Sequence, residues 1–166
     1  MAAIETHCEE VVLAKADYLI QQGQRCRHLY FIEQGLLRGY YNSDGKEVTH
    51  WFSFEHDFAT SFHSFITGEP TVENIQALEG CVLWRIAKDD LSKLCAQHHE
   101  IERLLRLTYE QYYLRLEERF INNQFKTAAE RYQLLLAQRP KIIERVPVGQ
   151  IASYLGISAE TLSRVR

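Results

Sequence analysis

A short segment near the end of the chain carries side chains that could read DNA bases. Glu160, Ser163 and Arg164 are spaced at i, i+3 and i+4, so on a helix they share one face. A carboxylate can accept a hydrogen bond from the cytosine amino group, and an arginine can bind guanine through two hydrogen bonds. These three residues are predicted to contact base edges. The simpler alternative is a helical hairpin of an ordinary bundle, in which Glu160 and Arg164 form a local ion pair.

Other residues of the same segment could bind the DNA backbone. Ser158 and Thr161 lie near the expected start of the helix, where hydroxyls and backbone amides commonly hold phosphate. Arg166 adds a cation at the other end of the same helix. We predict that Ser158, Thr161 and Arg166 contact phosphate.

The surrounding pattern is typical of a helix-turn-helix. Gly156 comes where the first helix must stop, because glycine adopts the left-handed conformation at low cost. Ser158 is a good N-cap for the second helix, and the small Ala152 lets that helix approach closely. Apolar residues occupy the positions that two crossed helices turn toward each other: Ile151, Leu155, Ile157, Leu162 and Val165. The second helix of this motif usually enters the major groove.

Composition bounds the class of protein. The 166 residues are 46% hydrophobic and 25% charged, which is typical of a globular chain of one domain or two small ones. No apolar run is long enough to span a membrane and no signal peptide is seen, so we expect a cytoplasmic protein without membrane contact. The net charge is −3, but residues 139–166 hold five basic and two acidic side chains. A basic end on an acidic body suits a protein that meets phosphate with one end.

Catalytic and metal chemistry have little support. The chain has no Walker loop, GxGxxG, GxSxG or HExxH motif, so no enzyme, catalytic residue or metal site is predicted. His50, His56 and His63 lie in the β-rich part without ligand spacing, and a cupin-like metalloenzyme remains an alternative. The four cysteines form no CxxC pair and are expected to be reduced.

The first half of the chain predicts a β-rich domain. Asp44-Gly45 is a strong hairpin signal, and residues 58–67 interrupt the strands with a short helix or a loop. Many short strands at this spacing favour a barrel or a jelly roll. The expected strands lie at 11–13, 18–20, 28–32, 36–41, 48–52, 75–78 and 82–86.

From Asp89 onward the apolar period becomes helical, with Asp89 or Asp90 expected as the N-cap. No glycine or proline interrupts residues 101–120, so one helix of about five turns is predicted. Its apolar stripe is aromatic in the middle, which favours self-association over simple packing on the β domain. We predict dimer contacts at Leu105, Tyr109, Tyr112 and Leu116. A second helix is expected over 127–138, ending before Pro140.

Taken in order, these elements resemble the Crp/Fnr family of bacterial transcription regulators. The resemblance implies an α+β fold with a cyclic-nucleotide-binding-like jelly roll at 1–99, a dimerisation helix at 100–123 and a helix-turn-helix domain at 124–166. It also implies a homodimer that binds two-fold symmetric operators in double-stranded DNA, with RNA polymerase as a further candidate partner. The segments that carry the resemblance are 20–23, 30–38, 44–47, 128–132, 151–158 and 162–164.

The chain departs from the family where cyclic nucleotides bind. Binders in the family present a Gly-Glu pair and, about ten residues later, an arginine that pairs with the cyclic phosphate. Residues 58–62 and 70–73 lack this arginine, and Glu69 and Glu73 add negative charge. We therefore predict no cyclic AMP binding and no cofactor, and the effector is unknown. Only Cys8 lies where iron–sulfur members carry several cysteines, so no cluster is expected.

Two questions stay open in the sequence. The chain ends at Arg166 within the expected recognition helix, so either the sequence is trimmed or the regulator lacks a wing. The main alternative function is a β-roll sensor of small molecules that acts through a protein partner.

Overall fold

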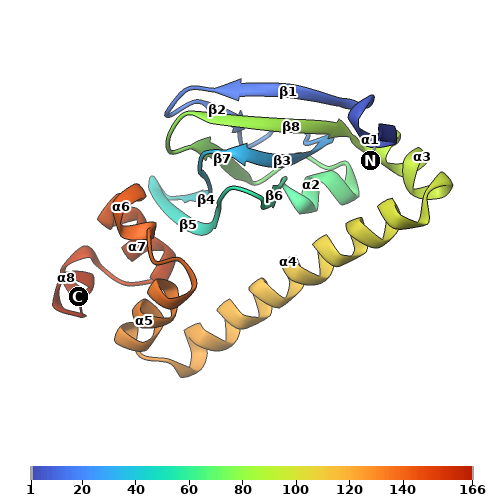
Figure 1. Ribbon diagram of the computed structural model, residues 1–166. Helices are drawn as coiled ribbons and strands as arrows, with labels where there is room; N and C mark the ends of the chain where they lie inside the picture. Colours follow the sequence, from blue (N-terminus) through green and yellow to red (C-terminus); the bar gives the residue numbers. More distant parts are fainter. Residues whose placement is uncertain (1, 166) are drawn as a thin grey trace.

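The fold is described by a computed structural model that covers residues 2–165, and it has a β-roll followed by helices (Figure 1). One sheet has the strand order β1-β8-β3-β6 and the other β2-β7-β4-β5. All pairings are antiparallel. The strands are β1 (Cys8–Leu13), β2 (Tyr18–Ile20), β3 (His28–Gln34), β4 (Leu37–Ser43), β5 (Lys46–Ser53), β6 (Phe58–Ala59), β7 (Glu73–Ala77) and β8 (Cys81–Ala87). The predicted jelly roll and the α+β class are confirmed.

The roll is held together by apolar side chains that both sheets turn inward. Ile32, Leu37 and Ile75 are completely buried, and Leu83 joins them from β8. The alternation of buried and exposed residues along β7 is typical of a strand with one face on a core. This core explains why short runs of branched and aromatic residues form strands here.

The hairpin predicted at Asp44-Gly45 joins β4 to β5. Ser43 pairs with Lys46 across it, and both turn residues have positive φ, 50° for Asp44 and 79° for Gly45. This is the backbone of a two-residue turn that matches the twist of the strands. The interruption at 58–67 contains the short strand β6 and the helix α2 (Phe62–Thr67); β6 was not predicted.

Six helices follow the roll. They are α3 (Lys88–Gln97), α4 (His99–Phe125), α5 (Ala128–Gln138), α6 (Ile142–Arg145), α7 (Val148–Leu155) and α8 (Ala159–Val165), and α1 (Ala2–Glu5) precedes β1. Asp89 and Asp90 were wrongly expected to cap α3: the cap is Ala87, and both carboxylates lie in the first turn, where they still face the positive end of the helix dipole. Thr127 caps α5 in a capping box with Glu130.

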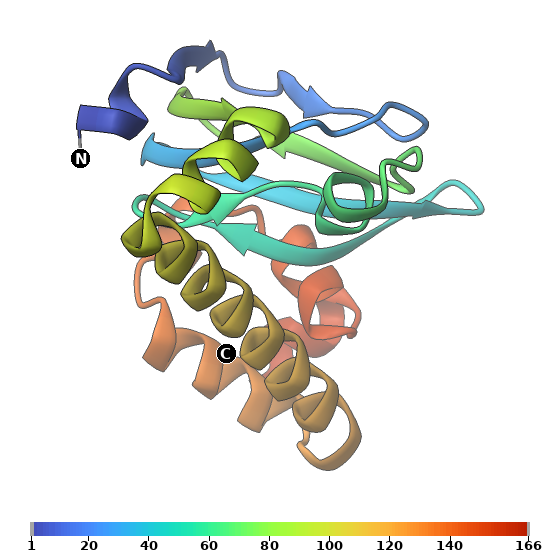
Figure 2. The same ribbon diagram turned by 90° about the vertical axis from the view of Figure 1, so that its right-hand side faces the viewer.

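The long helix α4 connects the two ends of the molecule. Figures 1 and 2 show it leaving the roll beside α3 and reaching the C-terminal helices at its far end. It continues past 123, the end expected from the sequence, to Phe125. The C-terminal helices then return to the roll, and α7 packs on β5. One apolar cluster contains Leu36 and Phe54 of the roll together with Leu135, Ile151 and Leu162 of the helices.

Candidate nucleic-acid interface

The turn between α7 and α8 has the geometry that its sequence predicts. Gly156 ends α7 with φ of +67°, and its N–H donates to the carbonyls of Ala152 and Ser153. The N–H of Ile157 also donates to the Ala152 carbonyl, at 3.0 Å. These bonds satisfy carbonyls that the end of the helix leaves free, and they fix the direction in which α8 starts.

Helix α8 is anchored on one face and exposed on the other. Leu162 is 1% exposed and Val165 is half-buried, and both pack in the cluster shared with α7 and α5. At the N-terminus, the N–H of Thr161 donates to the Ser158 hydroxyl at 3.1 Å. The predicted N-cap is therefore confirmed, and it orients the first turn of the helix.

The predicted base-reading residues lie together on the exposed face of α8. Glu160, Ser163 and Arg164 are all exposed, and no ion pair joins Glu160 to Arg164 within the described range 2–165. The backbone N–H of Glu160 and the Ser158 hydroxyl hold the pKa of the Glu160 carboxyl below its usual value, so it is ionised at neutral pH. A charged acceptor and a charged donor are thus exposed on one surface.

The predicted phosphate contacts are only partly available. Ser158 is exposed and Thr161 half-buried, and their hydroxyl oxygens are 3.1 Å apart. Both hydroxyls therefore already have a partner in the helix cap, and Ser158 is the more exposed of the two. Arg166 lies outside the described residues. Phosphate contact by Ser158, Thr161 and Arg166 therefore stays a prediction.

The first helix of the motif is attached to the roll by a hydrogen bond that the sequence did not predict. The N–H of Thr49 on β5 donates to the Ser153 hydroxyl at 2.9 Å, and that hydroxyl donates to the Glu47 carbonyl at 3.1 Å. The ring of Tyr154 lies 5.3 Å from that of Phe52. Helix α7 therefore packs on β5, the last strand of its sheet. Helix α8 lies on the side of α7 that faces away from the roll (Figure 1).

Arg119 links α4 to both of these elements. Its guanidinium donates to the backbone carbonyls of Thr49, at 3.1 Å, and His50, and it lies 5.0 Å from the centre of the Tyr154 ring. Burial lowers the pKa of this guanidinium from its usual value. Arg119, a residue of the long helix, thus contacts both the roll and the helix-turn-helix.

Arg145 forms a second link between the C-terminal helices and the roll. Its guanidinium donates two hydrogen bonds to Glu55, at 2.6 and 3.0 Å, and two to Glu79, at 2.5 and 3.3 Å. The hydrogen bonds from Arg145 lower the pKa of the Glu55 carboxyl to about 2. Paired hydrogen bonds of this kind are both strong and directional, so they fix α6 against two loops of the roll.

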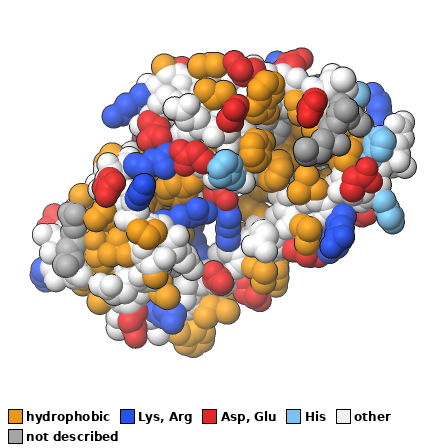
Figure 3. Space-filling model, in the orientation of Figure 1, with side chains coloured by type: hydrophobic (Ala, Val, Ile, Leu, Met, Phe, Trp, Pro, Cys, Tyr) orange, Lys and Arg blue, Asp and Glu red, His pale blue; other side chains and the backbone are white. Residues whose placement is uncertain are grey.

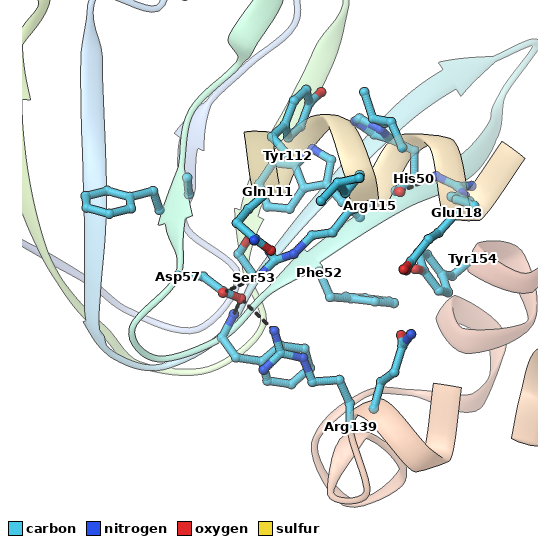
Figure 4. A pocket seen from close by; sticks show the side chains of 18 of the residues that line it. His50, Phe52, Ser53, Asp57, Gln111, Tyr112, Arg115, Glu118, Arg139 and Tyr154 are labelled. Atoms are coloured by element: carbon cyan, nitrogen blue, oxygen red, sulfur yellow. Dashed lines mark hydrogen bonds and ion pairs between the residues drawn. The ribbon is translucent and has the colours of Figure 1, made fainter. Parts of the chain in front are cut away.

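A cleft of about 660 Å³ lies between β5, α4 and α5. Figure 3 shows Lys and Arg side chains gathered around a hollow between the roll and the C-terminal helices. In Figure 4, Arg115 of α4 and Arg139 after α5 reach Asp57 from two sides, at 2.8 and 3.1 Å. The opposite wall includes Phe52 and Tyr154.

Inside the roll, Glu73 is buried and partnered. Its carboxylate lies 2.5 Å from the His50 ring nitrogen and accepts a hydrogen bond from the Trp51 indole at 3.0 Å. It lies on β7, after the segment where the cyclic-nucleotide binders place their arginine, whereas Glu69 is exposed. No lysine or arginine forms an ion pair with Glu73 within residues 2–165.

The residues predicted as dimer contacts lie on two surfaces. Leu105, Tyr109 and Tyr112 are half-buried against their own subunit, where both tyrosine rings contact Phe62 at 5.7 and 4.0 Å. Leu116 is exposed. Other exposed apolar residues of α4 include a row at Leu107, Leu114, Ile121 and Phe125, and Leu104, Tyr113 and Phe120 are exposed beside it. The sequence contains this row, but periodicity alone does not say which of two apolar faces meets the roll.

Residues 2–165 contain no group of three or more histidine, cysteine, aspartate or glutamate side chains arranged to hold a metal ion. No helix in the same range is both long and apolar enough to cross a bilayer.

The chain thus has a jelly roll joined by one long helix to a helix-turn-helix whose second helix is exposed. The chain belongs to the cyclic nucleotide-binding domain family, whose sequence model matches residues 10–98, more than half of its length. The predicted resemblance is confirmed. A comparison with curated protein sequences finds no match.

Solved structures share this fold at low sequence identity. FixK2 from Bradyrhizobium japonicum has a TM-score of 0.81 at 19% identity, covering 95% of this chain and 82% of that one. The c-di-GMP responsive global regulator CLP of Xanthomonas campestris has a TM-score of 0.76 at 19% identity, covering 99% and 88%. A chain from Eubacterium rectale assigned to the Crp/Fnr family has a TM-score of 0.76 at 19% identity, covering 99% and 79%.

Proposed function

We propose that this protein is a dimeric DNA-binding transcription regulator without enzymatic activity, which recognises two-fold symmetric operators under control of an effector. The observation that carries the proposal is the exposure of Glu160, Ser163 and Arg164 on one face of α8, a helix that is capped by Ser158 and packed through Leu162. The shared fold supports it, because the matching structures include a chain of the Crp/Fnr family and a global regulator.

DNA binding is tested by selecting bound sequences from a random duplex pool with the purified chain. Enrichment of a palindromic motif is expected, because a two-fold symmetric dimer presents its two recognition helices to two half-sites. Affinity for random duplex should fall steeply as salt rises, since phosphate contacts release counterions. A pool without enrichment, together with binding that salt does not change, would favour the sensor that acts through a protein partner.

Replacing Arg164 by alanine is expected to weaken operator binding by about 1–3 kcal/mol, as the loss of one arginine–guanine pair would. Arg164 is exposed and has no ion-pair partner among the described residues, so the fold should be unaffected. Fluorescence anisotropy on the operator and on a scrambled duplex measures the change. The loss should be larger on the operator. An equal loss on both duplexes would assign Arg164 to phosphate instead.

We infer that the dimer forms along the exposed row of α4. Leu107, Leu114 and Ile121 are seven residues apart, which is the repeat that keeps one face of a helix against a partner helix. Leu114 is 47% exposed and Phe125 is 82% exposed, although both are apolar. A second α4 lying along this row would remove these side chains from water.

The change Leu114→Asp is expected to raise the dimer dissociation constant at least about tenfold, because it places an unpaired charge in an apolar contact. The matched control is Tyr113→Asp, which introduces the same charge at an exposed residue outside the row. Analytical ultracentrifugation over a concentration series measures both variants. Equal weakening by the two changes would argue for a contact face other than this row.

Cyclic AMP is not our candidate effector. The stretch between β6 and β7 has no arginine, and Glu73 is already paired with His50 and Trp51. A cyclic phosphate in the roll would meet this carboxylate without a guanidinium to offset its charge.

A further inference from the structure

We propose that the cleft between β5, α4 and α5 is a binding site for a small organic phosphate, whose dianion is held by arginines of α4 and α5. The cleft, of about 660 Å³, lies within the range of small-molecule sites. No residue of α8 lines it. The argument rests on its charges, on two arginines that have no carboxylate partner, and on its apolar wall.

The cleft has an excess of positive charge. Four arginines line it: Arg115, Arg119, Arg131 and Arg139. Its carboxylates are Asp57 and Glu118. Asp57 is shared between Arg115 and Arg139, and Glu118 is exposed. The excess of two positive charges matches a phosphate monoester, which carries close to two negative charges at neutral pH.

Of the four arginines that line the cleft, Arg119 and Arg131 form no ion pair with a carboxylate of residues 2–165. Arg131 donates to the Lys126 carbonyl at 2.8 Å, and Arg119 donates to carbonyls of β5. The Nε atoms of both are buried and have no hydrogen-bond partner among the described residues. A half-buried guanidinium without a counterion is costly, and a bound anion would reduce that cost. Phosphate accepts the paired hydrogen bonds that a guanidinium offers.

The wall of the cleft suits an apolar or aromatic group attached to the phosphate. Phe52, Leu134 and Tyr154 line it, and the Tyr154 ring already stacks under Arg119. An inorganic anion would leave this surface in water, whereas an organic phosphate would cover it.

A ligand in this cleft would contact both sides of the junction that holds the helix-turn-helix. Arg119 belongs to α4 and lies against α7, whereas Arg131 belongs to α5. A phosphate bound by both would favour one placement of the C-terminal helices over another. This consequence rests on the proposed function, but the binding itself does not.

Isothermal titration of the full chain tests the site, with phenyl phosphate as the probe and phenol and benzoate as matched ligands. Phenyl phosphate is expected to bind, with phenol at least about tenfold weaker and benzoate in between, because the charged hydrogen bonds supply most of the affinity. Arg131→Gln should weaken phenyl phosphate about tenfold or more. Arg115→Gln is a second variant at a half-exposed side chain, in case Arg131→Gln fails to fold as judged by circular dichroism.

The control variant is Arg27→Gln, which removes the same charge from an exposed site in the roll. The proposal is overturned if phenyl phosphate does not bind, if phenol binds equally well, or if Arg27→Gln weakens binding as much as the cleft variants. It is also overturned if Arg131→Gln and Arg115→Gln weaken random-duplex DNA as strongly as Arg164→Ala does, which would make the cleft a backbone contact. Failure of the chain to bind any DNA would refute the proposed regulator while leaving the titration result intact.

Discussion

Replacing Leu162 by alanine is expected to lower the free energy of unfolding by about 2–5 kcal/mol and to abolish specific DNA binding. Leu162 is 1% exposed and is the fully buried residue of α8. The change leaves a cavity between α8, α7 and α5. Because α8 has only seven residues and Leu162 is its one buried side chain among those described, little other packing compensates for the loss. Without this anchor the proposed base-reading face loses its fixed direction, since Glu160 and Arg164 depend on the orientation of the helix.

Chemical denaturation and operator binding measure the two effects together. The matched control is Leu162→Met, which conserves volume and should cost less than about 1.5 kcal/mol. If the alanine variant were as stable as the methionine variant, α8 would be held by something other than the apolar cluster. If stability fell but operator binding did not, the surface that reads DNA would lie elsewhere.

Replacing Arg145 by methionine is expected to lower the free energy of unfolding by about 1–3 kcal/mol. The guanidinium binds Glu55 and Glu79 at once, so its loss leaves two carboxylates facing each other without a cation. All three side chains are between 23% and 35% exposed, and we therefore expect less than the cost of breaking a fully buried pair. Arg27→Met, at an exposed arginine, is the control and should change stability by less than about 0.5 kcal/mol.

The effect of Arg145→Met should depend on pH in a defined direction. Hydrogen bonds from Arg145 lower the pKa of Glu55 from 4.5 to about 2, so the folded state binds this proton less readily than the unfolded chain. The stability that the contact contributes is therefore full above pH 4.5 and is lost as pH falls toward 2. Denaturation curves of both proteins at pH 7 and pH 3 measure the difference between them. A difference that grows on acidification would contradict the assigned contact.

Much of the local structure could be predicted from the residues themselves. Asp44-Gly45 and Gly156 mark turns that require positive φ, and Ser158 caps α8, because each of these depends on the conformation of a few neighbouring residues. The short strands and the helix-turn-helix follow from apolar periodicity in the same way. The exposure of Glu160, Ser163 and Arg164 follows as well, since Leu162 and Val165 define the buried face.

The tertiary structure alone decided which surfaces meet. Periodicity on α4 gave one apolar stripe, and only packing showed that Tyr109 and Tyr112 of that stripe contact Phe62 of the same chain while Leu114, outside it, stays exposed. The contacts of Ser153 with Thr49 and of Arg145 with Glu55 join residues 104 and 90 positions apart. No local pattern encodes such partners, because a side chain's spacing along its own helix carries no information about which distant strand it will reach.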